Sequence, residues 1–155
     1  MTPLLKKLNY KEQKEIIAIN APKSFADELT AMKVNAKIIT DLHKASNVEF
    51  AICFVTTQPE IDDFVSTIDG KINGDATIWL CYPKSSSKKY NCDFNRDTGF
   101  SSVGKYGFEP VRQVAIDEDW SSLRFRKVKF IKTITRKESF AFTTEAKQRT
   151  TKKGQ

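Results

Sequence analysis

The chain has 155 residues, of which 39% are hydrophobic and 29% are charged, which is typical of an ordinary globular protein with one buried core. No apolar run approaches the roughly 20 residues that cross a bilayer, and residues 1–7 lack the apolar centre of a signal peptide. We therefore expect a cytoplasmic protein without a membrane partner. One histidine and three scattered cysteines supply too few ligands for a zinc site.

The net charge of +7 is concentrated toward the C-terminus. Residues 1–120 have a net charge of −2, whereas residues 121–155 have a net charge of +9. Such an asymmetry bears on the partners of a protein rather than on its fold.

The first third of the chain predicts a short helix, a strand, a helix and a second strand. Thr2 and the following proline are typical of a capped helix start. An apolar strand is expected over residues 16–20, followed by a helix with Ser24 as its cap. A shorter strand over residues 36–40 is expected at the edge of the sheet.

The central stretch predicts a strand, a helix and a strand. Residues 50–55 and 76–82 are apolar runs typical of strands that are covered on both faces. Pro59 suits the first turn of the intervening helix, and Asn73-Gly74 is expected to end it. Two buried strands joined by a helical crossover pair in parallel, and we expect the strand at residues 16–20 to lie between the second and third strands.

The last part of the chain predicts a helix and a hairpin. Asp93 is expected to cap a helix that runs to about Lys105. A fifth strand is expected over residues 110–116, and a sixth begins at Leu123. The predicted fold is a single three-layer α/β domain over residues 1–138, with a mostly parallel, Rossmann-like sheet of about six strands that ends in an antiparallel hairpin. Residues 139–155 are expected to form a basic, partly disordered extension.

This order of elements is similar to a shortened methyltransferase sheet of the Rossmann-like type, in which a strand also follows a phrase like Gly107-Phe108. More closely, the chain resembles a small bacterial family that is known only as a domain of unknown function. The likeness covers about residues 2–130, and it implies no established activity. The residues that carry it are Leu4–Leu8, Asn20-Ala21-Pro22, Trp79, Tyr82-Pro83-Lys84, Asp117-Glu118, Trp120-Ser121 and Leu123-Arg124-Phe125.

Ligands of an open parallel sheet bind outside the carboxyl ends of its strands, where the strand order reverses. Asn20, Pro22, Thr56 and Lys84 are the candidates for binding a small anionic ligand at this edge. Ala21 and Pro22 stand where a cofactor enzyme has a glycine-rich loop, and proline lacks a backbone donor. We therefore expect no cofactor, and adenosylmethionine only under the alternative of a divergent methyltransferase.

Asp117, Trp120 and Arg124 form the densest cluster of residue types that are common in functional sites, and we include them among the ligand-binding candidates. The structural alternative is that Trp120 covers the end of the hairpin, with Asp117 and Arg124 paired across it.

Residues 124–132 interleave positive charge with aromatic rings, as nucleic-acid binders do, and the same composition protects an exposed edge strand from aggregation. A change of side-chain parity near Arg126-Lys127 predicts a bulge or a change of environment. The candidate nucleic-acid residues are Arg126, Lys127, Lys129, Phe130 and Lys132.

These observations favour a non-catalytic or degenerate Rossmann-like module that binds an unknown protein partner or a small anionic ligand. The alternatives are a divergent methyltransferase and a nucleic-acid-associated protein. No nucleophile and base are suggested by spacing, so the sequence leaves open whether the chain is an enzyme.

Overall fold

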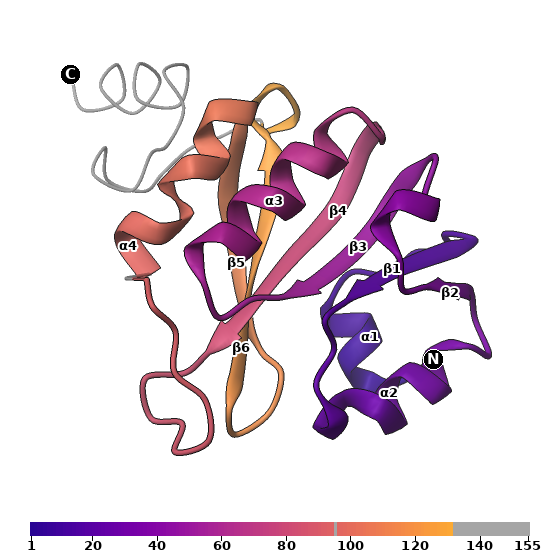
Figure 1. Ribbon diagram of the computed structural model, residues 1–155. Helices are drawn as coiled ribbons and strands as arrows, with labels where there is room; N and C mark the ends of the chain where they lie inside the picture. The colour runs from indigo at the N-terminus through magenta and orange to yellow at the C-terminus, as the bar shows by residue number, and fades with distance from the viewer. Residues whose placement is uncertain (95, 132–155) are drawn as a thin grey trace.

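The computed structural model describes residues 1–94 and 96–131. These residues contain one mixed β-sheet of six strands (Figure 1). The strand order in this sheet is β2-β1-β3-β4-β6-β5. The strands are β1 (Glu15–Ile19), β2 (Lys37–Ile39), β3 (Val48–Phe54), β4 (Ile72–Pro83), β5 (Phe108–Ala115) and β6 (Trp120–Lys127).

The sheet has a parallel half and an antiparallel half. Strands β2, β1, β3 and β4 pair in parallel, whereas β6 pairs antiparallel with both β4 and β5. The prediction that the first strand lies between the second and the third is confirmed, as is the edge position of β2. The predicted fold class, a mostly parallel sheet that ends in an antiparallel hairpin, is also confirmed.

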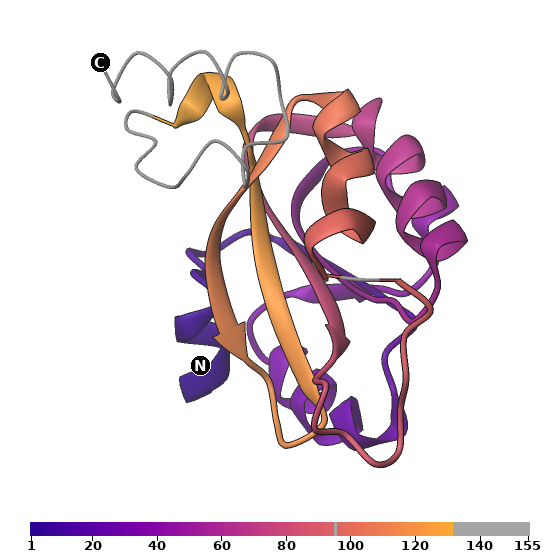
Figure 2. The same ribbon diagram turned by 90° about the vertical axis from the view of Figure 1, so that its left-hand side faces the viewer.

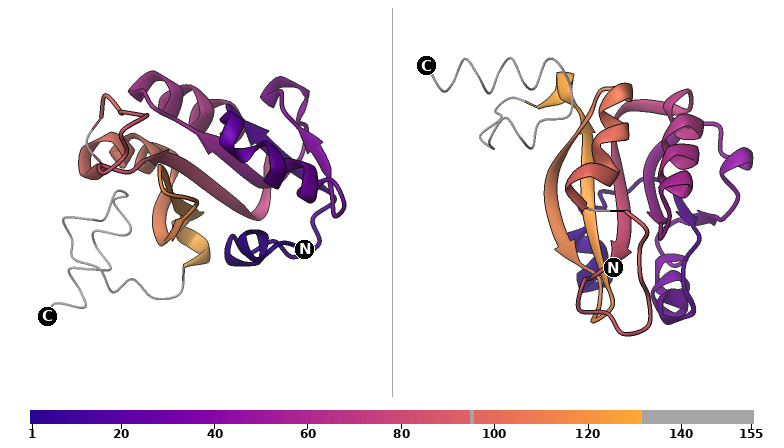
Figure 3. Two further views of the ribbon diagram at one scale, coloured as in Figure 1. Left: turned by 90° about the horizontal axis from the view of Figure 1, so that it is seen from below. Right: turned by 60° about the vertical axis from the view of Figure 1, so that its left-hand side comes forward.

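Helical segments cover both faces of the sheet. Figure 2 shows α3 and the segment after α4 on one side of the sheet, and α1 on the other. The view from below in Figure 3 separates the same layers. None of the helices in the described ranges is long and apolar enough to cross a membrane. The segments are α1 (Pro3–Lys7), η1 (Lys23–Phe25), α2 (Ala26–Met32), η2 (Leu42–Lys44), α3 (Gln58–Asp69), α4 (Arg96–Gly99), η3 (Phe100–Tyr106) and η4 (Val128–Phe130), where η marks a 3₁₀ helix.

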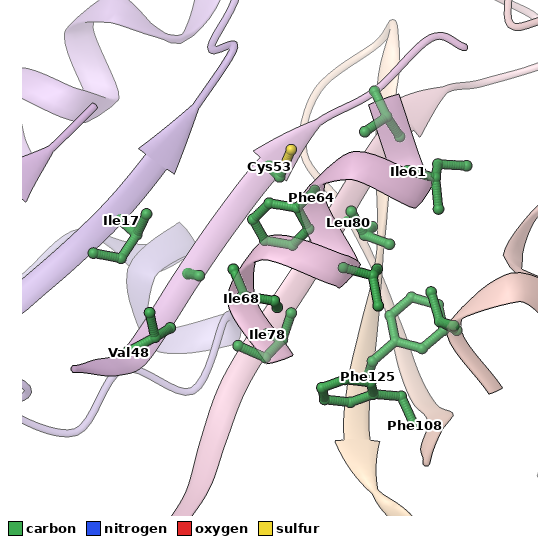
Figure 4. Packing of buried hydrophobic residues seen from close by; sticks show 14 of the residues in the cluster. Ile17, Val48, Cys53, Ile61, Phe64, Ile68, Ile78, Leu80, Phe108 and Phe125 are labelled. Carbon is green, nitrogen blue, oxygen red and sulfur yellow. The ribbon is translucent and has the colours of Figure 1, made fainter. Parts of the chain in front are cut away.

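The larger core lies between the sheet and the layer of α3 and η3 (Figure 4). Helix α3 repeats apolar residues at helical spacing, and Ile61, Phe64 and Ile68 are buried against the sheet. Burial of each such side chain stabilises the fold by about 1.5–3 kcal/mol. We refer to this side of the sheet as the α3 face.

A second core lies on the opposite side of the sheet, which we call the α1 face. Helix α1 begins as predicted, because the Thr2 hydroxyl accepts a hydrogen bond from the backbone N–H of Leu5 at 3.0 Å. Trp79 of β4 is fully buried in this core, and its indole N–H donates to the carbonyl of Leu8 at 2.8 Å. This bond ties the N-terminal segment to the centre of the sheet.

Asn73-Gly74 does not end α3, so that prediction is wrong. The helix already ends at Asp69, with Gly70 as its C-cap residue. Gly74 has a φ of +62° and lies in β4. It falls where the pairing register between β3 and β4 shifts, and a left-handed glycine is suited to such an irregularity.

The predicted helix cap at Ser24 is also wrong. Ser24 lies within η1, where Pro22 precedes the first turn and no side chain caps it. The Asp93 carboxylate accepts a hydrogen bond from the backbone N–H of Gln58 at 2.8 Å, at the first turn of α3. The predicted cap at Asp93 involves residue 95, which lies outside the described residues, and it stays a prediction. The predicted helix after Asp93 is the short α4, which passes into the 3₁₀ segment η3.

The C-terminal hairpin differs from the prediction in two respects. Strand β6 begins at Trp120 rather than at Leu123, and it lies between β4 and β5, so it is not an edge strand. The parity change near Arg126-Lys127 is the predicted change of environment rather than a bulge, since β6 ends at Lys127 and η4 begins at Val128. The register shift of the hairpin lies in β5, between Pro110 and Arg112. Two predictions fall outside the described residues: the extension over residues 139–155 and the nucleic-acid candidate Lys132.

Candidate functional site

The strand order reverses between β1 and β3, since the chain moves from β1 outward to β2 and then returns to the other side of β1. In open α/β sheets the crevice outside the carboxyl ends of two such strands is the usual ligand site. The loops that border this crevice contain Asn20 after β1 and Thr56 after β3. The structure therefore brings these two predicted site residues to the same edge.

Asn20 has a φ of +58°, a left-handed conformation that glycine adopts most readily and that asparagine tolerates. It makes the tight turn after β1 that a glycine would otherwise make. Its side-chain amide reaches across the crevice and donates to Glu60 Oε2 of α3 at 3.4 Å. Pro22 is partly buried two residues later and precedes η1.

Glu60, in the first turn of α3, accepts hydrogen bonds from both loops that border this crevice. Its Oε1 atom accepts hydrogen bonds from the backbone N–H and the hydroxyl of Thr56 and from the same two groups of Thr57, at 2.9–3.1 Å. The Thr57 hydroxyl in turn accepts from the backbone N–H of Glu60 at 3.3 Å, which completes a capping box at the start of α3. The backbone N–H groups of Thr56 and Thr57 thus both bind a carboxylate of the chain itself.

The pKa of Glu60 reflects this arrangement. Burial by itself would raise the pKa, but the hydrogen bonds from Thr56 and Thr57 outweigh burial and lower it. A carboxylate whose pKa is lower in the folded than in the unfolded chain stabilises the fold at neutral pH, and this contribution is lost as the pH falls through the folded-state pKa.

We expect Glu60→Gln to reduce the acid sensitivity of the protein. The variant should lose about 1 kcal/mol of unfolding free energy at pH 7, as for other helix caps, and the difference from wild type should shrink between about pH 5 and pH 3. Urea unfolding at a series of pH values measures both effects. Asp63→Asn removes a carboxylate from the exposed side of the same helix and should retain the wild-type pH dependence. A constant difference between Glu60→Gln and wild type from pH 7 to pH 3 would contradict this assignment.

A second candidate site is a cleft of about 860 Å³ beyond the carboxyl end of β4, on the α3 face. The cleft contains Lys84, which is partly buried and whose backbone N–H donates to the carbonyl of Asp119 at 2.8 Å. Its volume lies within the range of pockets that hold small molecules. The lining residues are Tyr82, Pro83, Lys84, Ser85, Ser86, Tyr90, Asn91, Cys92, Phe94, Gln113, Ala115 and Ser121.

Three polar side chains from three strands meet on the wall of this cleft. The amide of Gln113 in β5 donates to Tyr82 Oη of β4 at 3.2 Å and to Ser121 Oγ of β6 at 3.1 Å. Tyr82 and Ser121 are buried, whereas Gln113 is exposed to the cleft. A wall of hydroxyl and amide groups beside one lysine can bind a polar ligand that carries negative charge.

The structure separates the three residues of the predicted hairpin cluster. The Asp117 carboxylate caps the hairpin turn, since it accepts from the backbone N–H groups of Asp119 and Trp120 at 2.8 and 2.9 Å. Trp120 is buried at the start of β6, where its ring packs against Phe54 and Tyr90. The predicted pairing of Asp117 with Arg124 is wrong. Arg124 lies four residues after Trp120 in β6, and the Asp117 carboxylate binds the backbone N–H groups of the turn.

Two of the nucleic-acid candidates form ion pairs within the domain. Arg126 binds Asp75 at 2.6 Å, and Lys127 binds Asp69 at 2.7 Å and lies over the Phe108 ring. Lys129 is exposed, and its ammonium lies 5.2 Å from the centre of the partly buried Phe130 ring. Arg126 and Lys127 are therefore less available to phosphates than the sequence predicts.

Glu60 is not among the predicted site residues, and neither is the group of Tyr82, Gln113 and Ser121. The spacing of Thr57 and Glu60 is that of a capping box, a signal that could have identified Glu60. No local signal joins Gln113 to Tyr82, because their proximity depends on how β5, β6 and β4 are paired.

Comparison with solved structures identifies the fold. A SAM-dependent methyltransferase from Aquifex aeolicus superposes with a TM-score of 0.53 at 10% sequence identity, over 80% of this chain and 87% of that chain. A ribosomal protein L11 methylase from Lactobacillus delbrueckii subsp. bulgaricus gives a TM-score of 0.50 at 10% identity, over 80% and 76% of the two chains. The chain therefore has the Rossmann-like fold of the SAM-dependent methyltransferases.

The sequence itself matches none of the protein-family models and none of the curated proteins. Membership in the small bacterial family of unknown function is therefore still a prediction.

The residues at the crevice do not fit adenosylmethionine well. Ala21 and Pro22 follow β1 in place of glycines, and Pro22 offers no backbone donor. Glu60 binds the backbone N–H groups of Thr56 and Thr57. The crevice thus has the position of a cofactor site, but its loop after β1 has no glycine and these two donors are already bound.

Proposed function

We propose that the chain is a non-catalytic, methyltransferase-like module whose cleft beyond β4 binds a small anionic ligand or an anionic group of a protein partner. The observation that carries this proposal is the position of Glu60, whose carboxylate binds the backbone N–H groups of Thr56 and Thr57 and the side chain of Asn20 at the cofactor crevice. The neighbouring cleft is then the site that is open to a ligand. In this cleft Lys84 supplies the positive charge, and Tyr82, Gln113 and Ser121 supply polar groups.

We also propose that the chain is a divergent, cytoplasmic relative of the small bacterial family that it resembles in sequence. Three residues of that likeness, Tyr82-Pro83-Lys84, line the cleft. The divergent methyltransferase is the second candidate function, since the fold is that of the methyltransferases.

The first test is the affinity for adenosylmethionine. We expect calorimetric titration of the full chain to give a dissociation constant no tighter than about 1 mM, because the loop after β1 has no glycine and the backbone N–H groups of Thr56 and Thr57 are already bound by Glu60. A micromolar constant would correspond to about 4 kcal/mol of additional binding free energy. Such a result would overturn the proposal and make the divergent methyltransferase the better description.

The second arm of the same test concerns the cleft. In a thermal-shift panel of nucleoside monophosphates and di- and tricarboxylates, we expect at least one compound to raise the unfolding temperature of wild type. The same compound should have little effect on Lys84→Gln, since that variant lacks the charge of the cleft. Lys37→Gln, which removes an exposed charge from the distant strand β2, is the matched control. A panel in which no compound distinguishes Lys84→Gln from wild type would count against the cleft.

A further inference from the structure

The α1 face of the C-terminal hairpin carries a pair of arginines on neighbouring strands. Arg124 of β6 pairs in register with Trp79 of β4 on one side and with Arg112 of β5 on the other. Residues directly opposite in antiparallel strands point to the same face of a sheet. Since Trp79 lies in the core of the α1 face, both arginines lie on that face.

The register shift in β5 creates this pair. Pro110 is paired with Phe125, which lies on the α3 face, and regular alternation would also place Arg112 on that side. The shift between Pro110 and Arg112 adds one residue to β5, so that Arg112 is paired with Arg124 instead. A bulge of this kind redirects the side chains that follow it.

Two like charges directly opposite each other destabilise a sheet, and no carboxylate of the described residues forms an ion pair with either arginine. Asp75 makes a two-nitrogen contact with the neighbouring Arg126. Glu109 is buried opposite Arg126 in the register and has interactions of its own. Neither Arg112 nor Arg124 thus has an ion-pair partner within residues 1–94 and 96–131.

The guanidinium group of Arg124 also has an unmet hydrogen-bonding requirement. Its Nε is buried and has no hydrogen-bond partner among the described residues. Burial lowers the pKa of Arg124, and the charges of Arg126 and Arg112 lower it further, although Asp75 partly offsets them. A buried, charged donor without an acceptor is costly, so the described part of the chain leaves this partly buried guanidinium group without the compensation that a bound anion would give.

We propose that Arg112 and Arg124 together bind a phosphate group on the α1 face of the hairpin. Guanidinium groups match the oxygens of phosphate with paired hydrogen bonds, and one tetrahedral anion between the two arginines would offset their repulsion. This site lies on the opposite face of the sheet from the cleft that contains Lys84, so it is independent of the proposed function.

The test uses inorganic pyrophosphate and a short single-stranded oligothymidylate as probes, titrated into the full chain by calorimetry. We expect saturable binding of at least one probe to wild type. Arg112→Gln and Arg124→Gln should each weaken that binding about tenfold or more, since each removes a charge-assisted hydrogen bond. The probe that binds more tightly identifies whether the phosphate comes from a small molecule or from a nucleic-acid strand.

Two controls separate this site from general charge effects. Lys37→Gln removes one exposed positive charge from the far edge of the sheet, and Lys105→Gln removes one from η3 on the α3 face; both should bind the probes like wild type. Arg112 is exposed, so Arg112→Gln tests the proposal even if Arg124→Gln does not fold. Arg112→Gln without probe should unfold at the wild-type temperature or above it, because the repulsion is removed. Absence of saturable binding to wild type, or wild-type binding by Arg112→Gln, would overturn the proposal.

Discussion

Replacement of Trp79 by alanine is expected to lower the free energy of unfolding by about 3–5 kcal/mol, as for other large buried aromatic residues. The Trp79 side chain is fully buried at the centre of the α1 face. The substitution leaves a cavity and also removes the indole N–H donor from the carbonyl of Leu8. Since domains of this size are stable by about 5–15 kcal/mol, this loss is a large part of the whole. Urea unfolding followed by circular dichroism measures it.

Trp79→Phe separates the two contributions. Phenylalanine fills most of the cavity but cannot donate to Leu8, so the remaining loss should be about 1–3 kcal/mol, the cost of a buried polar group without a partner. If both variants lost less than about 1 kcal/mol, the segment around Leu8 would not depend on Trp79 for its position.

Replacement of Phe100 by alanine should have an effect of similar size, about 3–5 kcal/mol. Phe100 is fully buried at the start of η3, and its ring centre lies 5.3 Å from that of Tyr82 and 5.6 Å from that of Phe125. It therefore joins the 3₁₀ layer to β4 and β6. Aromatic pairs of this geometry add to the stability that burial gives.

The matched control is Phe100→Leu, which keeps a large apolar side chain and should cost no more than about 1.5 kcal/mol. Chemical denaturation of the two variants beside wild type gives the comparison. Equal losses for leucine and alanine would mean that the ring contacts, rather than the buried volume, determine the contribution of Phe100.

The parallel half of the fold is predictable because its signals are local. Residues 50–55 and 76–82 are continuous apolar runs, and a strand that is covered on both faces has no other sequence pattern. The crossover between them requires a parallel pairing. The error at Asn73-Gly74 has the same local origin, since a helix stop and a strand irregularity use the same residue types.

The candidate sites depend on pairings that no local signal contains. The wall of the cleft requires β6 to lie between β4 and β5, so that Gln113 reaches both Tyr82 and Ser121. The opposition of Arg112 and Arg124 requires a register shift of one residue in β5. Side-chain parity beyond a bulge cannot be read from a single sequence, because a one-residue shift exchanges the two faces.

The position of β6 has a consequence for synthesis on the ribosome. The four parallel strands are complete once Pro83 has emerged, but the strand that pairs with the free side of β4 is the last of the six in the described chain. Until β6 emerges, the apolar edge of β4 around Ile78 and Leu80 has no neighbour. An open edge of this kind can pair with other nascent chains. The interval between the synthesis of β4 and that of β6 is therefore the period in which the nascent sheet exposes an open edge that the folded protein lacks.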